Sequence, residues 1–193
     1  MKGTFIAVYG INNIGKSTHC KKIVKRLTDE GHKAYYVKYP VYEIKPSGQF
    51  LNNALRGGGN KLSEEELQLW FVINRYQFQP KLKKLLEDGY IVVAEDYIGT
   101  GIAWGTAKGV DEAWLEGVNS LLLKEDFSLM LEGARSLDAK EKGHLHEDDD
   151  ELAEKCRVVH EFLADKFGWT KVKVQKKKSD TAKLVWAEIE NFL

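Results

Sequence analysis

Apolar and polar positions follow two different periods along the chain. Short apolar runs bounded by glycine, proline or charged residues predict β-strands, and longer segments with apolar residues on one face predict α-helices. The expected strands are residues 4–9, 33–39, 90–94, 127–131 and 170–174. The expected helices are residues 16–30, 48–56, 63–88, near 99–108, 111–123, 149–167 and from near 179 to the C-terminus.

Cap and breaker residues support several of these boundaries. Gly31 is placed to cap the first helix, and the triple glycine 57–59 ends the short second one. Ser63 followed by Glu66 has the spacing of a capping box at the start of the long third helix. Pro80 lies inside that helix, where we expect a kink or a break.

Strands that alternate with helices predict a parallel sheet covered by helices on both faces. We therefore expect an α/β fold with a five-stranded parallel sheet, in a single domain spanning residues 1–193, because no repeat or interdomain linker interrupts the pattern. Residues 133–148 show little apolar periodicity. We interpret them as a short lid segment rather than a domain boundary.

Composition narrows the class of protein. The 193 residues are 43% hydrophobic and 30% charged, which is typical of a soluble globular protein. The 29 basic and 29 acidic residues cancel, which argues against nucleic-acid binding through bulk charge. No apolar run has the length of a membrane span, and the N-terminus does not read as a signal peptide. Cys20 and Cys156 have no paired spacing, so we expect reduced thiols in a cytoplasmic protein.

The segment GINNIGKS, residues 10–17, matches the pattern G-x-x-x-x-G-K-[ST] between an apolar strand and a helix. Gly10 and Gly15 let the backbone curl so that its N–H groups and the helix N-terminus face an anion. Lys16 would reach the β- and γ-phosphates of ATP, and the Ser17 hydroxyl would bind Mg²⁺. The expected nucleotide-binding residues are Gly10, Asn12, Asn13, Ile14, Gly15, Lys16, Ser17 and Thr18.

Residues 10–17 thus have the pattern of a phosphate-binding loop, or P-loop. Other segments indicate which class of P-loop protein this is. The guanine motif Asn-Lys-x-Asp of GTPases is absent from the sequence. Residues 10–34, the Tyr-Pro pair at 39–40, LWFVINRYQ at 69–77 and EDYIGTGIAWGTAKG at 95–109 resemble the thymidylate kinase family of P-loop nucleoside monophosphate kinases. The resemblance runs nearly end to end. It implies a P-loop NTPase fold, ATP as phosphoryl donor with Mg²⁺, conversion of dTMP to dTDP, and a possible homodimer.

The resemblance also implies residue roles. Phe71 would stack on the base, and Arg75 would hydrogen-bond to it. Lys16, Glu95 and the lid residue Arg135 would be catalytic, with Ser17 and Glu95 holding the metal ion. The expected substrate-binding residues are Tyr39, Phe71, Arg75, Asp96, Tyr97 and Trp104.

These residues also have plainer explanations. An arginine in an apolar helix face is costly without a partner, and Arg75 could find one in a nearby acid instead of a base. Phe71, Tyr97 and Trp104 could equally be core packing residues. From the residues alone, these alternatives stay open.

Two adjacent acids at the end of VVAEDY mark the main departure from the family pattern. Glu95 replaces an aspartate that helps to hold Mg²⁺, but Asp96 replaces an arginine that contacts the acceptor phosphate, which a carboxylate would repel. A second family arginine, after the Tyr-Pro pair, is also absent: Val41 and Tyr42 follow there. Asn12 stands in place of the P-loop acid that approaches the sugar.

Three functions are compatible with these departures. In the first, the protein remains a monophosphate kinase in which Lys38, Lys45 or Arg56 holds the acceptor phosphate and pairs with Asp96. In the second, it phosphorylates a nucleoside or another hydroxyl compound, with Asp96 or Glu95 as general base. In the third, it binds nucleotide without catalysis. The end-to-end similarity favours the first.

Two charged segments have ordinary explanations. HLHEDDDE, residues 144–151, contains potential metal ligands, but acids at a helix start favour the helix dipole, and we prefer that reading. KKKSD, residues 176–180, falls where the family places the edge of adenine. We prefer a solvated charge run with Ser179 capping the last helix.

Overall fold

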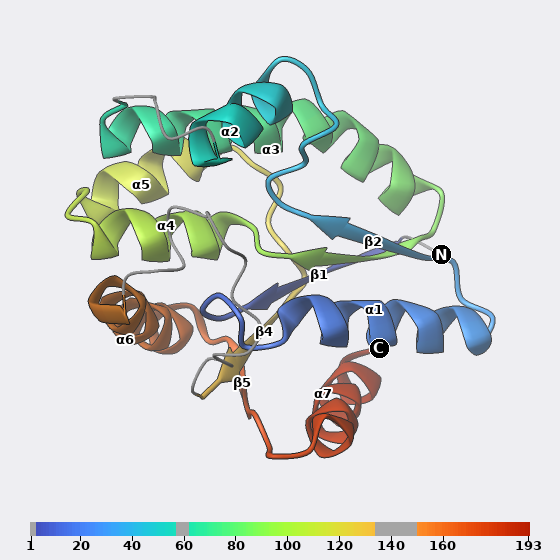
Figure 1. Cartoon of the computed structure of the whole chain (residues 1–193). Helices are drawn as coiled ribbons and strands as arrows, with labels where there is room; N and C mark the ends of the chain where they lie inside the picture. The colour runs from blue at the N-terminus through green and yellow to red at the C-terminus, as the bar shows by residue number, and fades with distance from the viewer. Residues whose placement is uncertain (1–2, 57–61, 134–149) are drawn as a thin grey trace.

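The computed structural model of the chain describes residues 3–56, 62–133 and 150–193. Its strands are β1 (Thr4–Tyr9), β2 (Ala34–Lys38), β3 (Ile91–Glu95), β4 (Phe127–Glu132) and β5 (Thr170–Lys173). Its helices are α1 (Lys16–Asp29), α2 (Ser47–Arg56), α3 (Glu64–Glu87), α4 (Ile98–Ala107), α5 (Glu112–Asn119), α6 (Asp150–Phe167) and α7 (Lys178–Phe192). Figure 1 shows these elements as a sheet with helices on both sides. The expected α/β fold is therefore confirmed.

All strand pairs are parallel, and the strand order is β2-β3-β1-β4-β5. The central strand β1 supplies both faces of the core because its side chains alternate. Phe5, Ala7 and Tyr9 pack on the face that includes residues of α3, α4, α5 and α6. Ile6 and Val8 pack on the face covered by α1 and α7. The site lies at the carboxyl ends of β1 and β3, where ligands bind in open parallel sheets.

Local signals in the sequence account for most helix ends. The backbone N–H groups of Gly31 and His32 donate to Thr28 and Leu27, which closes α1 with a left-handed glycine as expected. Ser63 Oγ accepts a hydrogen bond from the Glu66 N–H at the start of α3.

Three details differ from the expectations. The helix expected over 111–123 ends at Asn119, because Ser120 and Asn119 turn their side chains back to the carbonyls of Gly117 and Leu115. Helix α3 continues through Pro80, so the alternative of a break is wrong, while a kink there stays a prediction. The N-cap of α7 is Lys177 rather than Ser179.

Candidate active site

The P-loop wraps around the ammonium group of its own lysine. Gly10 and Gly15 adopt positive φ angles of 132° and 104°, as the tight curl requires. Lys16 begins α1 and is buried; its Nζ donates to the carbonyls of Gly10 and Ile11 at 2.8 and 2.9 Å. The first turn of α1 contains no acidic residue, so the positive end of the helix dipole is left uncompensated for an anion.

Glu95 ends β3 and binds groups from two other elements, α1 and β2. Its Oε1 accepts a hydrogen bond from Ser17 Oγ at 2.6 Å and lies 3.2 Å from Lys38 Nζ, and its Oε2 accepts one from the Tyr36 hydroxyl. Burial disfavours the charged carboxylate, but Lys38 and these hydrogen bonds together hold the pKa of Glu95 below its ordinary value. Glu95 therefore stays anionic at neutral pH and lies beside the P-loop serine.

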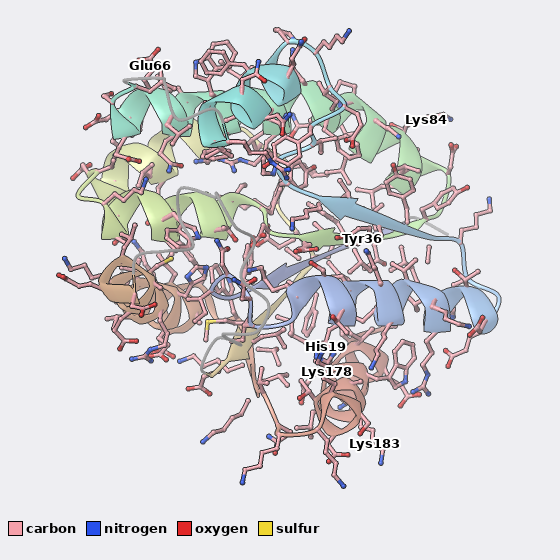
Figure 2. The ribbon with its side chains drawn as sticks, viewed as in Figure 1. His19, Tyr36, Glu66, Lys84, Lys178 and Lys183 are labelled. Carbon is pink, nitrogen blue, oxygen red and sulfur yellow. The ribbon has the colours of Figure 1, made fainter. Side chains whose placement is uncertain are left out.

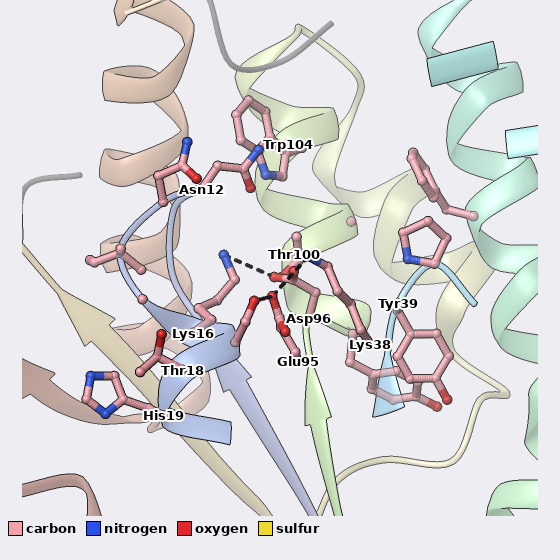
Figure 3. Close-up of a pocket in the computed structure, with 18 of the residues that line it drawn as sticks. Asn12, Lys16, Thr18, His19, Lys38, Tyr39, Glu95, Asp96, Thr100 and Trp104 are labelled. Atoms are coloured by element: carbon pink, nitrogen blue, oxygen red, sulfur yellow. Dashed lines mark hydrogen bonds and ion pairs between the residues drawn. The ribbon is translucent and has the colours of Figure 1, made fainter. Parts of the chain in front are cut away.

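Asp96 turns its side chain back toward the P-loop. Its φ is 62°, in the left-handed region, and its backbone N–H donates to Val8. The carboxylate accepts a hydrogen bond from Thr100 Oγ1 at 2.8 Å and lies 3.5 Å from Lys16 Nζ (Figure 3). Burial raises the pKa of Asp96; Lys16 opposes this rise, and the charge on Glu95 adds to it. The ion pair formed by Asp96 is thus with the P-loop lysine, a cation that the sequence did not suggest as its partner.

One cavity of about 710 Å³ connects the P-loop to helices α3 and α4. Its P-loop side extends to the β5–α7 connection, where Gln175, Lys176 and Lys178 line it. Figure 2 shows His19 on α1 and Lys178 at the start of α7, which both line this end. A volume of this size is within the range of small-molecule and cofactor sites.

Arg75 is buried at the far end of the cavity. Its Nη1 lies 3.4 Å from the Tyr97 carbonyl, but Nε and Nη2 have no hydrogen-bond partner among the described residues. Burial lowers the pKa of Arg75 to about 10, so the guanidinium is charged at neutral pH. Among the described residues, Arg75 has no salt bridge with an acid.

The four aromatic residues named from sequence all line the cavity, but they differ in what they can contact. Phe71 is half-buried on α3, and Trp104 is buried on α4. The Tyr39 hydroxyl is buried without a partner among the described residues. The Tyr97 hydroxyl instead donates to the Leu123 carbonyl at 2.8 Å, and its ring packs on Phe5. Tyr97 therefore lines the cavity, but its hydroxyl group is already hydrogen-bonded within the protein.

The nucleotide-binding residues expected from the sequence gather as a group. Asn12, Asn13, Ile14, Gly15, Lys16, Ser17 and Thr18 line the cavity, and Gly10 lies behind them with its carbonyl on Lys16. Arg135 and the expected lid lie outside the described residues, apart from Gly133. Within the described segments, no cluster of three potential metal ligands occurs. Asp150 and Glu151 occupy the first turn of α6, as the helix-start reading expected.

Sequence reasoning missed two buried amides on α3. Asn74 is fully buried and clamps the segment after β2: its Oδ1 accepts from the Val41 N–H, and its Nδ2 donates to the carbonyl of Val41 and to Ser47 Oγ. Gln68 is 2% exposed and also lines the cavity. Helical spacing was the available signal, because Gln68, Phe71 and Arg75 share one face.

Comparisons with known proteins agree on one family. The family model for thymidylate kinase matches residues 8–182. A relative from Invertebrate iridescent virus 6 is 27% identical over 173 residues, which cover 89% of this chain and 80% of that protein. The thymidylate kinase of Danio rerio is 30% identical over 132 residues, which cover 68% of this chain but only 61% of that enzyme.

Solved structures show the same fold. The thymidylate kinase of Candida albicans superposes with a TM-score of 0.80 at 24% identity, over 98% of this chain and 92% of that one. The family match spans most of the chain and includes the P-loop, Glu95 and the cavity residues of α3 and α4. The chain therefore belongs to the thymidylate kinase family.

Proposed function

We propose that this protein transfers the γ-phosphoryl group of ATP to the phosphate of dTMP, giving ADP and dTDP. The observation that carries the proposal is one continuous cavity, which has the P-loop at one end and Phe71, Arg75 and Trp104 at the other. A kinase needs such continuity because donor and acceptor must meet in one water-poor space. Family membership supplies ATP as the donor and a nucleotide as the acceptor.

At the donor end, the backbone of residues 10–17 and the N-terminus of α1 would bind the phosphates of ATP. Lys16 would move from the carbonyls of Gly10 and Ile11 to the β- and γ-phosphates. These two carbonyls are neutral, and its charged partner Asp96 also accepts a hydrogen bond from Thr100. Lys176 and Lys178 border the cavity beside the P-loop, so we place the rest of the nucleotide near the β5–α7 connection.

The residues present fit a magnesium ion. Ser17 Oγ and Glu95 Oε1 are 2.6 Å apart, and a hydroxyl beside an ionised carboxylate is a set of hard oxygen donors suited to Mg²⁺. When bound, the ion would neutralise charge on the β- and γ-phosphates. The role of Glu95 would be to orient the Ser17 oxygen and to remain anionic.

At the acceptor end, two nitrogens of Arg75 find no partner in residues 3–56, 62–133 and 150–193, and Phe71 offers a flat apolar face. A thymine ring stacked on Phe71 would present carbonyl oxygen to Arg75, satisfying donors that are otherwise buried without partners. Trp104 and Tyr39 would close the sides of the pocket, and Tyr97 would support it from the core.

The acceptor phosphate needs cations other than the missing family arginines. Lys38 at the end of β2 and Arg56 at the end of α2 both line the cavity, so we assign the phosphate to them. Lys45, the third residue considered, does not line it. Arg135 would add positive charge during transfer; it lies outside the described residues, and its role rests on family resemblance.

Transfer would then depend on alignment and charge neutralisation rather than on a covalent intermediate. The chain would hold the two phosphates in line between Lys16 and the Lys38–Arg56 side. In the part of the chain that the structure describes, no helix is long and apolar enough to cross a membrane. The homodimer and the cytoplasmic location inferred from the sequence stay predictions.

An ADP-release assay with Mg·ATP tests the proposal by comparing dTMP, thymidine and no acceptor. We expect wild-type protein to release ADP with dTMP, and Lys16→Ala to lose about 100-fold or more in rate. Lys25→Ala, an exposed lysine on the same helix, should behave as wild type. Turnover with thymidine alone would instead assign a hydroxyl acceptor, and binding of ATP without any turnover would assign a non-catalytic role.

A further inference from the structure

Gln68 is a buried polar side chain whose hydrogen-bonding capacity the described residues do not fully satisfy. It is 2% exposed, lines the cavity, and its Oε1 has no hydrogen-bond partner among the described residues. A buried carbonyl oxygen without a donor is unfavourable, because it has lost its hydrogen bonds to water. The proposed hydrogen bond from Arg75 to the base gives the Gln68 oxygen no donor.

Gln68 and Arg75 lie on one face of α3, two turns apart, with Phe71 between them. Both reach toward glycines of α4. A Cβ on Gly101 would lie 3.0 Å from Arg75 Nη2, and a Cβ on Gly105 would lie 3.4 Å from Gln68 Cδ. Since Gly101 and Gly105 are one helical turn apart, the guanidinium and the carboxamide are roughly 6 Å apart along α4.

This spacing brings a donor and an acceptor to the same end of the cavity. With respect to the residues that the structure describes, Arg75 offers N–H groups without partners and Gln68 offers a carbonyl oxygen without a partner. Two protein groups about one helical turn apart can bond to neighbouring atoms of one pyrimidine ring, because hydrogen bonds to a ring edge diverge outward. A ligand edge that carries an acceptor next to a donor would satisfy both side chains at once.

We propose that Gln68 is a specificity-determining residue that accepts a hydrogen bond from the N3–H group of the acceptor base, while Arg75 donates to the neighbouring carbonyl. The inference rests on the proposed function, which places the base beside Arg75, and deepens it by selecting an imide base, thymine or uracil. Cytosine presents the opposite order, an amino group and then a ring nitrogen lone pair. It would set a donor against Arg75 and an acceptor against the Gln68 oxygen.

Equilibrium binding of two nucleosides tests this without any phosphate. Thymidine and 3-methylthymidine differ in the N3 hydrogen, which the second replaces by a methyl group. By calorimetry, we expect wild-type protein to bind thymidine at least about tenfold more tightly. Gln68→Met, which keeps the side-chain length without the amide, should weaken thymidine binding and reduce the ratio to near one. Gln49→Met, an exposed glutamine of α2 outside the cavity, is the matched control and should keep the wild-type ratio.

Steady-state kinetics provide a second readout. Gln68→Met should lower the ratio of kcat/KM for dTMP to that for dCMP by about tenfold, while Gln49→Met leaves it unchanged. The inference is overturned if Gln68→Met keeps the wild-type nucleoside ratio, or if wild-type protein binds the two nucleosides equally.

The same two measurements distinguish a failure of the proposed function from a failure of the role of Gln68. Wild-type protein would then discriminate between the nucleosides through Gln68 but release no ADP with dTMP. Conversely, normal dTMP turnover with unaltered specificity in Gln68→Met would reject the role of Gln68 alone.

Discussion

Asp96 and Lys16 form a buried ion pair, with Oδ1 3.5 Å from Nζ, at the point where β3 meets the P-loop. The pair explains how a carboxylate can occupy a position that carries arginine in the family pattern. Asp96 faces the P-loop lysine and the Thr100 hydroxyl, so its charge is partly balanced before any nucleotide binds. Lys16 contacts Asp96 and would also have to contact an incoming phosphate, so we expect Asp96 to weaken phosphate binding.

Asp96→Asn should therefore strengthen binding of the anionic substrates. The amide can still accept the hydrogen bond from Thr100, but it no longer repels phosphate or competes for Lys16. We expect the KM for dTMP to fall by up to about tenfold, with a smaller effect at high salt. Steady-state kinetics at two ionic strengths measure this.

Asp29→Asn is the control, because it makes the same change in net charge at an exposed position of α1. A rise in the KM for dTMP in Asp96→Asn would contradict the prediction. It would mean that the carboxylate itself helps to bind the acceptor.

Lys38→Ala and Arg56→Ala should each raise the KM for dTMP by about tenfold and leave the KM for ATP nearly unchanged, if these cations hold the acceptor phosphate. Lys45→Ala removes an equal charge from a residue that does not line the cavity, and it should have little effect. Lys38 also pairs with Glu95, so Lys38→Ala should additionally alter the dependence of rate on Mg²⁺ concentration. Equal effects of all three substitutions would show that only general charge matters.

The fold was predictable because β1 and β3 are short apolar runs buried on both faces, and glycine follows helix α1 at the required turn. The P-loop was predictable because its chemistry is local in sequence. The partner of Asp96 was not: the sequence suggested Lys38, Lys45 or Arg56, whereas a left-handed backbone at Asp96 turns the carboxylate toward Lys16. A single φ angle of this kind leaves no signal in apolar periodicity.

Side-chain roles at the acceptor end were only partly predictable for a related reason. Tyr97 looked like a substrate-binding residue, and it lines the cavity, but its hydroxyl binds the carbonyl of Leu123, which follows the end of α5. Gln68 was not among the residues expected in the site. Gln68 is buried where α3 lies next to Gly105 of α4, and packing between two different helices cannot be read from one segment.

Gly101→Ala should weaken substrate binding without lowering the stability of the protein. Alanine is favoured over glycine inside a helix by up to about 1 kcal/mol, so the free energy of unfolding should stay the same or rise. The new Cβ, 3.0 Å from Arg75 Nη2, would displace the guanidinium, and we expect the KM for dTMP to rise about tenfold. Gly117→Ala on α5 has no atoms within 4 Å of its Cβ and should gain stability without changing KM. An unchanged KM in Gly101→Ala would argue against a contact between Arg75 and the base.

We predict that the protein loses stability in mild acid because of the buried side chain of His160. It is 1% exposed on α6, its Nδ1 lies 2.8 Å from the Cys156 carbonyl, and its Nε2 has no hydrogen-bond partner among the described residues. Burial lowers its pKa to about 4; the charge on Lys16 adds to this, and the Cys156 carbonyl opposes it. The folded protein therefore keeps His160 neutral at a pH where the unfolded chain, with an ordinary pKa of about 6.5, binds a proton.

Because the unfolded state binds more protons between these two pKa values, stability must fall as the pH falls through that window. The expected contribution of His160 is a loss of about 2 kcal/mol between pH 7 and pH 5. Urea unfolding at pH 7, 6 and 5 measures it. His160→Gln should flatten the dependence, and His32→Gln, at an exposed site after α1, should not. His19, whose pKa burial also lowers, stays in both variants and cancels in the comparison. Parallel loss of stability in wild type and His160→Gln would show that His160 gains its proton equally in both states.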